Sequence, residues 1–228
     1  MESTNLENKI GVVFKNKNLL KEALTHRSYI NENPKWGLAH NERLEFLGDA
    51  VLELAVTENL FNKFPDSPEG ELTSIRAALV NYQMLAIIAK NIELDNFILL
   101  SRGEAKDVGK AREVISANAF EALLGAVYLD AGYDEAKKFI GTFVMSQLQE
   151  VIDKKLYKDP KSLLQEIAQD KFKVTPTYIV FSERGPDHAK IFQIGVHFGD
   201  KLIAEGEGLS KQEAEVEAAK NALRSFQH

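Results

Sequence analysis

The sequence predicts a multi-domain α+β protein, with an all-α domain first and a small domain of order α-β-β-β-α after it. Apolar side chains recur at helical spacing as far as about residue 152. Residues 190–198 instead alternate between apolar and polar side chains, as in a strand with one buried face. A polar, basic segment separates the two patterns. We therefore expect domains at 1–152 and 159–228, joined by a linker at 153–158.

The composition is that of an ordinary folded chain, with 44% hydrophobic and 27% charged residues among 228. The absence of cysteine excludes disulfides, a cysteine-ligated zinc and a thiol nucleophile. The N-terminus has no basic segment followed by an apolar run, and no run of 18 apolar residues occurs. We therefore expect a cytoplasmic protein with no membrane partner. A net charge of −6 argues against strong non-specific binding to nucleic acid.

The first domain is expected to be helical throughout, beginning with two short helices within residues 1–30. The segment 101–112 is polar, glycine-containing and partly basic, which is typical of a loop. Gly132 is expected to end a helix as its C-cap. The longer helices are expected near residues 40–63, 69–90, 114–130 and 134–148.

The second domain begins with a capping signal, because Asp159 precedes a proline at the first helical position. Ser210 and Glu213 form a capping box that opens the last helix. The expected strands lie near residues 178–181, 190–198 and 201–205.

The helix expected at 40–63 carries Glu42, Glu45 and Asp49 at spacings i, i+3 and i+7, which place them on one face. Most surface helices have a charged outer face, so this pattern alone does not require a function. Phe46 does not fit, because it lies with the acids at about 200° from the first residue of the apolar stripe. It indicates a face that is covered by a partner chain or a substrate. The expected apolar stripe consists of Leu44, Leu47, Val51 and Leu54.

The helix expected at 114–130 has a similar arrangement, because Asn118 and Glu121 lie one turn apart and opposite a core stripe. Carboxylate and amide oxygens are ligands that Mg²⁺ accepts. An acidic cluster with a divalent metal is a standard means of activating water against a phosphodiester. Acids are nonetheless common on helices, so spacing by itself favours a solvated face.

Other polar residues have simple structural explanations. Glu69 lies at a helix N-terminus, where the helix dipole favours an acid. His26 is interpreted as a packed or capping residue, and the five histidines show no metal-ligand spacing. Lys211 near a helix N-terminus would either meet a phosphate or be solvated. The loop Gly185-Pro186-Asp187-His188 has an ordinary turn sequence.

Several segments together resemble one family. One segment resembles the signature of ribonuclease III, the endonuclease that cuts double-stranded RNA. This segment is Asn41-Glu42-Arg43-Leu44-Glu45-Phe46-Leu47-Gly48-Asp49. Residues 159–228 resemble the family's C-terminal double-stranded-RNA-binding domain, including Gly185-Pro186-x-His188. The resemblance covers nearly the whole chain, in the short bacterial form. Further matching segments lie at residues 23–28, 64–70 and 120–125.

The resemblance implies that residues 1–152 are the endonuclease domain, with Mg²⁺ as cofactor and Mn²⁺ as a possible substitute. Asn118 stands where the family usually has Asp, so the site loses one negative charge and we expect weaker metal binding. The family's metal-binding carboxylates align with Glu45, Asp49 and Glu121.

Other positions match further parts of the family's catalytic valley and its homodimer. Glu42 and Glu69 align with acidic residues of that valley, some of which are contributed across the dimer. Phe46 aligns with the aromatic residue that inserts into the partner subunit. The implied catalytic set is Glu42, Glu45, Asp49, Glu69, Asn118 and Glu121.

The resemblance also implies contacts between the second domain and RNA. His188 would reach one minor groove of A-form RNA, and Lys211 would contact the phosphates between this groove and the next. The family usually has paired basic residues at that place, whereas this domain contains 9 basic and 11 acidic side chains. We therefore expect modest, strongly salt-sensitive binding. The neighbouring minor groove would be contacted by Ser162, Gln165 and Glu166.

The function implied is that of a homodimeric, Mg²⁺-dependent endoribonuclease acting on structured precursor RNAs, ribosomal ones included. Its products would carry 5′-phosphates and short 3′ overhangs. The alternative is a double-stranded-RNA-binding protein that has lost cleavage, which only Asn118 favours. A purely helical dimer scaffold would leave the second domain unexplained.

Overall fold

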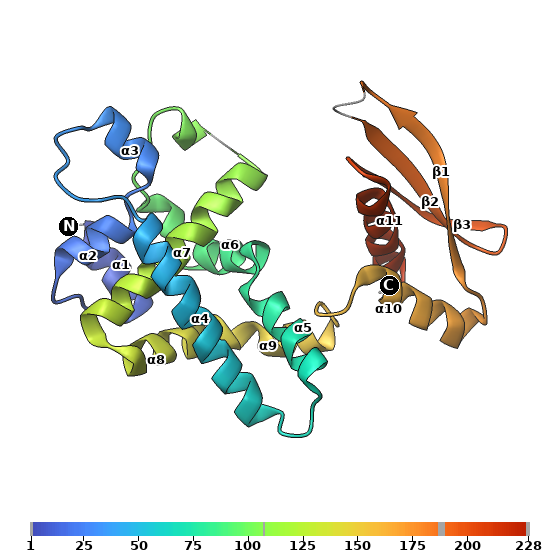
Figure 1. The fold of residues 1–228 in the computed structure, drawn as a ribbon, viewed down its shortest axis with the longest axis horizontal. Helices are drawn as coiled ribbons and strands as arrows, with labels where there is room; N and C mark the ends of the chain where they lie inside the picture. The colour runs from blue at the N-terminus through green and yellow to red at the C-terminus, as the bar shows by residue number, and fades with distance from the viewer. Residues whose placement is uncertain (1, 107, 187–189, 227–228) are drawn as a thin grey trace. The chain divides into compact units, whose positions relative to one another are not determined.

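The computed structural model describes the chain except for residues 1, 107, 187–189 and 227–228. It forms two compact units, Met1–Tyr157 and Lys158–His228. The first unit is helical, and the second contains a three-stranded antiparallel sheet with helices (Figure 1). The predicted fold class, an all-α domain followed by an α-β-β-β-α domain, is confirmed.

The first unit follows the predicted order of helices, with shifted boundaries. The helix expected at 40–63 begins at Glu42, because the carbonyl of Asn41 accepts its first helical hydrogen bond, from Glu45 N, at 2.9 Å. The described helices and short turns of this unit are α1 (Glu2–Ile10), α2 (Lys17–Ala23), α3 (Arg27–Glu32), α4 (Glu42–Lys63), α5 (Glu69–Val80), α6 (Tyr82–Asn91), η1 (Leu94–Asn96), η2 (Glu104–Lys106), α7 (Lys110–Ala131), α8 (Tyr133–Phe143), η3 (Met145–Gln147) and α9 (Leu148–Asp153).

The helix expected at 69–90 is in fact two helices, α5 and α6, which bend by 46° where they meet. The backbone of Asn81 is extended at this break, and its side-chain oxygen accepts a hydrogen bond from Met84 N at 3.0 Å. Asparagine is a strong N-cap, so it starts a new helix although the apolar spacing continues across it. The helix expected at 134–148 is also divided, into α8, η3 and α9.

Two more helical segments differ from the prediction. A third short helix, α3, follows the first two because His26 caps it by accepting a hydrogen bond from Ser28 N at 3.3 Å. This capping role is the one expected for His26. The central helix α7 starts at Lys110, inside the expected loop 101–112, directly after Gly109 with its φ of 67°.

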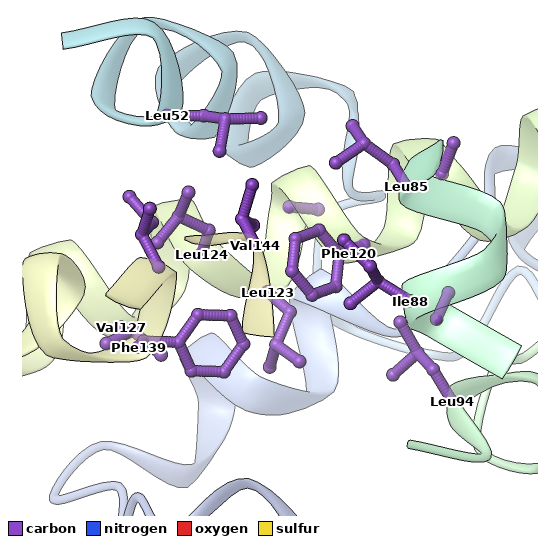
Figure 2. Packing of buried hydrophobic residues seen from close by; sticks show 14 of the residues in the cluster. Leu52, Leu85, Ile88, Leu94, Phe120, Leu123, Leu124, Val127, Phe139 and Val144 are labelled. Atoms are coloured by element: carbon purple, nitrogen blue, oxygen red, sulfur yellow. The ribbon is translucent and has the colours of Figure 1, made fainter. Parts of the chain in front are cut away.

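The core of the first unit is built around α7, which packs against α2, α4, α6 and α8. The ring of Phe120 is fully buried and lies 5.5 Å from that of Phe139 in α8. Figure 2 shows Phe120 facing Leu85 and Ile88 of α6. By length and composition α7 could span a membrane, as could the bent pair α5–α6, but 61% of the apolar window of α7 is buried inside the unit. Its apolar side chains thus serve the core.

The second unit packs helices on one face of its sheet, whose strand order is β1-β2-β3. Val196 on the central strand pairs with Tyr178 and Ala204 and is fully buried with Leu164 and Ala218 of the helices. Two strands, β1 and β3, are longer than expected because the residues that extend them do not follow the alternating pattern, whereas β2 begins one residue later than expected. The elements are α10 (Pro160–Ile167), the π-helical turn η4 (Ala168–Phe172), β1 (Pro176–Arg184), β2 (Ile191–Phe198), β3 (Lys201–Gly208) and α11 (Lys211–Ser225).

The first unit extends beyond residue 152, into the expected linker 153–158. Leu156 N donates to the carbonyl of Val151 at 2.9 Å. The ring of Tyr157 packs on the helical core, and its hydroxyl lies 3.4 Å from Oε1 of Glu71. These contacts hold the segment to the first unit as far as Tyr157.

Candidate active site

The candidate site lies where α4 and α7 cross, and two glycines bring the helices into backbone contact. A Cβ atom on Gly48 would lie 1.8 Å from the carbonyl oxygen of Glu121, and one on Gly125 would lie 2.2 Å from that of Leu44. No other residue type fits at this separation. Glu45 and Asp49 flank Gly48 on α4, so the crossing brings the acidic face of α4 to Glu121.

The surface of α7 opens at this crossing. In the fully described stretch 115–127, only Asn118 and Glu121 are not buried. They lie one turn apart and therefore on one face of the helix. The structure thus places both predicted residues of α7 at the site, next to a helix that contributes the other candidates.

The electrostatics show that the carboxylates are close together and that Glu45 and Glu121 are partly withdrawn from water. Burial, together with the nearby charges of Asp49 and Glu45, raises the pKa of Glu121 to about 8. Burial also raises the pKa of Glu45, followed by the charges of Glu42 and Asp49. These influences all disfavour the ionised carboxylates. A bound cation would reverse that preference.

The residues present fit a hard divalent cation by their chemistry. The acidic oxygens of Glu45, Asp49 and Glu121 and the amide oxygen of Asn118 are the ligand types that Mg²⁺ accepts. Among the residues that the structure describes, no three His, Cys, Asp or Glu side chains are already arranged to hold a metal ion. The donor types and the mutual repulsion of the carboxylates nonetheless favour a cation at this crossing.

Glu42 lies at the edge of the cluster. Its Oε1 is 3.6 Å from Nη1 of Arg27, and its Oε2 is 3.8 Å from Nδ1 of His40. Its charge raises the pKa of Glu45, so it lies within electrostatic reach of the cluster. The structure thus brings Glu42 to the site, but beside two basic groups.

Glu69 is not brought to the cluster within one chain. It begins α5, where its Oε1 accepts a hydrogen bond from the Thr73 hydroxyl at 2.9 Å. It also lines a cavity of about 430 Å³ with Leu60 and Phe61, near the C-terminal end of α4. At about 1.5 Å per residue, α4 runs roughly 27 Å from Glu45 to that end. A contact between Glu69 and the cluster therefore requires a second copy of the chain.

Phe46 stands on an exposed apolar stripe of α4. Its side chain is 81% exposed, that of Phe61 is 70% exposed and that of Leu54 is 52% exposed. The prediction that Leu54 faces the core is therefore wrong, because the contact at Gly48 turns the Leu52 and Ala55 side of the helix toward α7. Leu54 instead lengthens the stripe that begins at Phe46.

The predicted RNA-binding residues of the second unit lie on exposed surface. Ser162, Gln165 and Glu166 are exposed on α10, and Oε2 of Glu166 lies 2.7 Å from Nζ of Lys158. Lys211 begins α11, and its Nζ lies 3.1 Å from Oε1 of Glu183. His188, which was also predicted to bind RNA, lies outside the described residues.

Sequence reasoning missed the two glycines of the crossing. A glycine inside a helix costs up to about 1 kcal/mol relative to alanine, so Gly48 and Gly125 inside long helices are a signal of close packing. It also missed Arg27 and His40, whose side chains lie beside the carboxylate of Glu42.

A helical unit with an acidic cluster at a helix crossing, followed by an α-β-β-β-α unit, defines the class of two-domain nucleases for structured RNA. The sequence profile described as Ribonuclease-III-like matches residues 16–148. The profile of the double-stranded RNA binding motif matches residues 160–225.

The chain belongs to the ribonuclease III family. It is 45% identical over 227 residues to Ribonuclease 3 of Desulforamulus reducens, an alignment that covers 100% of this chain and 91% of the relative. It is 47% identical over 218 residues to Ribonuclease 3 of Carboxydothermus hydrogenoformans, covering 96% and 93%. The nuclease domain of the Campylobacter jejuni enzyme has a similar structure, with a TM-score of 0.57 at 45% identity over 62% of this chain and 95% of that one.

The family and its two domains establish the kind of activity. The protein is an endoribonuclease of the ribonuclease III type that acts on double-stranded RNA. Membership of this family implies the use of a divalent metal ion, in agreement with the donor types at the crossing.

Proposed function

We propose that this protein is a homodimeric, Mg²⁺-dependent endoribonuclease of the cytoplasm that processes structured precursor RNAs, ribosomal RNA among them. Its products carry 5′-phosphates and short 3′ overhangs. The observation that supports the metal dependence most directly is the raised pKa of Glu121, about 8, beside Asp49 and Glu45. Because these surroundings disfavour the ionised form of the carboxylates, a divalent cation bound among them would offset their repulsion.

Each residue at the crossing has a distinct part in this proposal. Glu45, Asp49 and Glu121 would hold Mg²⁺, and Asn118 would add an amide oxygen without adding charge. When bound, the ion lowers the pKa of water and neutralises charge on the scissile phosphate. The backbone contact at Gly48 keeps the carboxylates of α4 and α7 at a fixed separation, so that the ligands are positioned before RNA arrives.

The homodimer is supported by the exposed stripe of α4. A two-fold axis makes contacts reciprocal, so an antiparallel pair of α4 helices would bring Phe46 of one copy to the C-terminal end of the other. The 430 Å³ cavity lined by Leu60 and Phe61 lies at that end and would take the Phe46 ring. The same pairing moves Glu69 toward the partner's carboxylate cluster. The C. jejuni structure is described as having a region involved in dimer formation.

The function is tested by incubating the full chain with a long RNA duplex in Mg²⁺ and then in Mn²⁺, with Glu121→Ala as the inactive control. Cleavage by the wild type and not by the variant supports the proposal. Binding without cleavage in either metal ion supports the alternative, a double-stranded-RNA-binding protein with Asn118 as its defect.

Sedimentation of Phe46→Ala tests the dimer, which should dissociate at concentrations where the wild type does not.

A further inference from the structure

A basic side chain at the edge of the acidic cluster has no role in the proposed function. Arg27 is the first residue of α3, and its Nη1 lies 3.6 Å from Oε1 of Glu42. His40 Nδ1 lies 3.8 Å from Oε2 of the same carboxylate. Glu42 also raises the pKa of Glu45. A guanidinium group therefore lies beside the carboxylates that would hold the metal.

The position of Arg27 is fixed by buried polar contacts. Asn41, which is 2% exposed, donates from its backbone N to the carbonyl of Thr25 at 2.9 Å. Its Nδ2 donates to the carbonyl of Ala23 at 3.4 Å. Thr25 is fully buried. The segment before Arg27 is thus tied to the start of α4, which keeps the backbone of Arg27 near Glu42.

The ion pair itself is weak. The side chain of Arg27 is 69% exposed, and 3.6 Å is longer than a hydrogen bond between these groups. Exposed pairs of this kind contribute about 0–1 kcal/mol. A phosphate offers the guanidinium two parallel hydrogen bonds, which are stronger. Arg27 can therefore leave Glu42 for an RNA phosphate at little cost.

We propose that Arg27 binds the RNA backbone next to the carboxylate cluster, by exchanging the carboxylate of Glu42 for a phosphate. Glu42 is then a positioning residue that holds Arg27 in the RNA-free enzyme. The exchange places a positive charge where the acidic cluster would otherwise repel the backbone. This inference rests on the proposed function in one respect, namely that RNA enters the site at the α4–α7 crossing.

The test is the salt dependence of duplex binding by the full chain in EDTA, where no cleavage occurs. Arg27→Gln should make the slope of log K against log salt shallower by about one and weaken binding about five- to tenfold. Arg27→Lys should keep the slope and lose about two- to fourfold, because the charge remains and the paired hydrogen bonds do not. The matched control is Lys9→Gln, which removes the same charge. Lys9 lies in α1, and its Nζ forms an ion pair with Oε1 of Glu93 at 2.9 Å.

A second measurement separates binding from positioning. Glu42→Gln should tighten duplex binding in EDTA about two- to threefold, and this gain should shrink in the Arg27→Gln background. In Mg²⁺, Arg27→Gln should raise KM by the same factor as the loss of affinity and leave kcat within about twofold. A slope for Arg27→Gln equal to that of Lys9→Gln overturns the proposal. If Arg27→Gln has the reduced slope but the wild type cuts no RNA, the contact at Arg27 is supported and only the proposed function is refuted.

Discussion

In the first unit, the candidate catalytic side chains project from two helices whose backbones touch at Gly48 and Gly125. In the second unit, the candidate RNA-binding side chains stand on exposed parts of α10 and α11. The first arrangement holds carboxylates together against their repulsion, whereas the second leaves Lys211 in an ion pair with Glu183. We therefore expect cleavage to depend on groups whose positions are fixed in advance, and RNA binding to depend on ion pairs that can be exchanged for phosphate.

The largest expected effect comes from separating the two helices. Gly48→Ala places a Cβ 1.8 Å from the Glu121 carbonyl oxygen, so α4 and α7 must move apart. We expect a loss of about 100-fold or more in cleavage rate and of about 1–3 kcal/mol in the free energy of unfolding. Duplex binding in EDTA should stay within about fivefold, because the second unit is unchanged. Single-turnover cleavage and fluorescence anisotropy measure the two quantities.

The control for this substitution is Gly141→Ala. Gly141 lies inside α8, and a Cβ there would meet nothing within 4 Å. We expect a wild-type cleavage rate and an unfolding free energy that is unchanged or higher by up to about 1 kcal/mol. A Gly48→Ala enzyme that cleaves as fast as Gly141→Ala would show that the backbone contact does not position the site.

The second effect concerns the charge held at the crossing. The pKa of Glu121 is raised from 4.5 to about 8, so in the metal-free folded state this carboxyl keeps its proton over a range where the unfolded chain loses it. The unfolding free energy should therefore fall as the pH rises from about 4.5 to about 8. Glu121→Gln should remove this part of the fall, on the order of 2–4 kcal/mol.

Urea unfolding in EDTA at pH 5 and pH 8 measures this difference. Glu113→Gln, an exposed position on the same helix, is the control and should unfold like the wild type at both pH values. Added Mg²⁺ should stabilise the wild type at pH 8 and stabilise Glu121→Gln much less. Parallel pH profiles for the two variants would contradict the explanation.

A smaller effect is expected from restoring the charge that Asn118 lacks. Asn118→Asp adds a carboxylate one turn from Glu121, so the Mg²⁺ concentration for half-maximal cleavage should fall about three- to tenfold. Duplex binding by the second unit in EDTA should not tighten. Titration of both enzymes with Mg²⁺ gives the answer, and identical activation curves would refute the role given to Asn118.

The smallest effect concerns the exchangeable pair of the second unit. Glu183→Gln frees Lys211, whose Nζ lies 3.1 Å from the carboxylate, and should tighten duplex binding about two- to threefold. Glu135→Gln, which breaks a similar pair with Lys138 in the first unit, controls for net charge. Anisotropy titrations in EDTA compare the two. Equal affinities would mean that Lys211 does not contact phosphate.

The sequence was sufficient for the order of elements and for the acids of α4, because helical and strand periodicity differ and because Glu45 and Asp49 share a face. It was not sufficient for the break at Asn81, where a side-chain cap overrides a continuous apolar spacing. Capping depends on a local hydrogen bond that periodicity does not record.

The sequence also failed to predict the exposure of Leu54, and periodicity alone did not give the distance of Glu69 from the cluster. The face that α4 buries is set by its contact with α7 at Gly48, and that contact joins residues far apart in the chain. Glu69 follows α4 closely in sequence, but the length of that helix carries it away from Glu45.

The contact between Gly48 and Gly125 also affects heat inactivation. The crossing is part of the buried core, and Leu52 and Phe120 pack beside it. Loosening the catalytic groups therefore requires loosening the core of the nuclease unit. On heating, activity should be lost at the melting temperature of this unit and not before, with no folded but inactive state between.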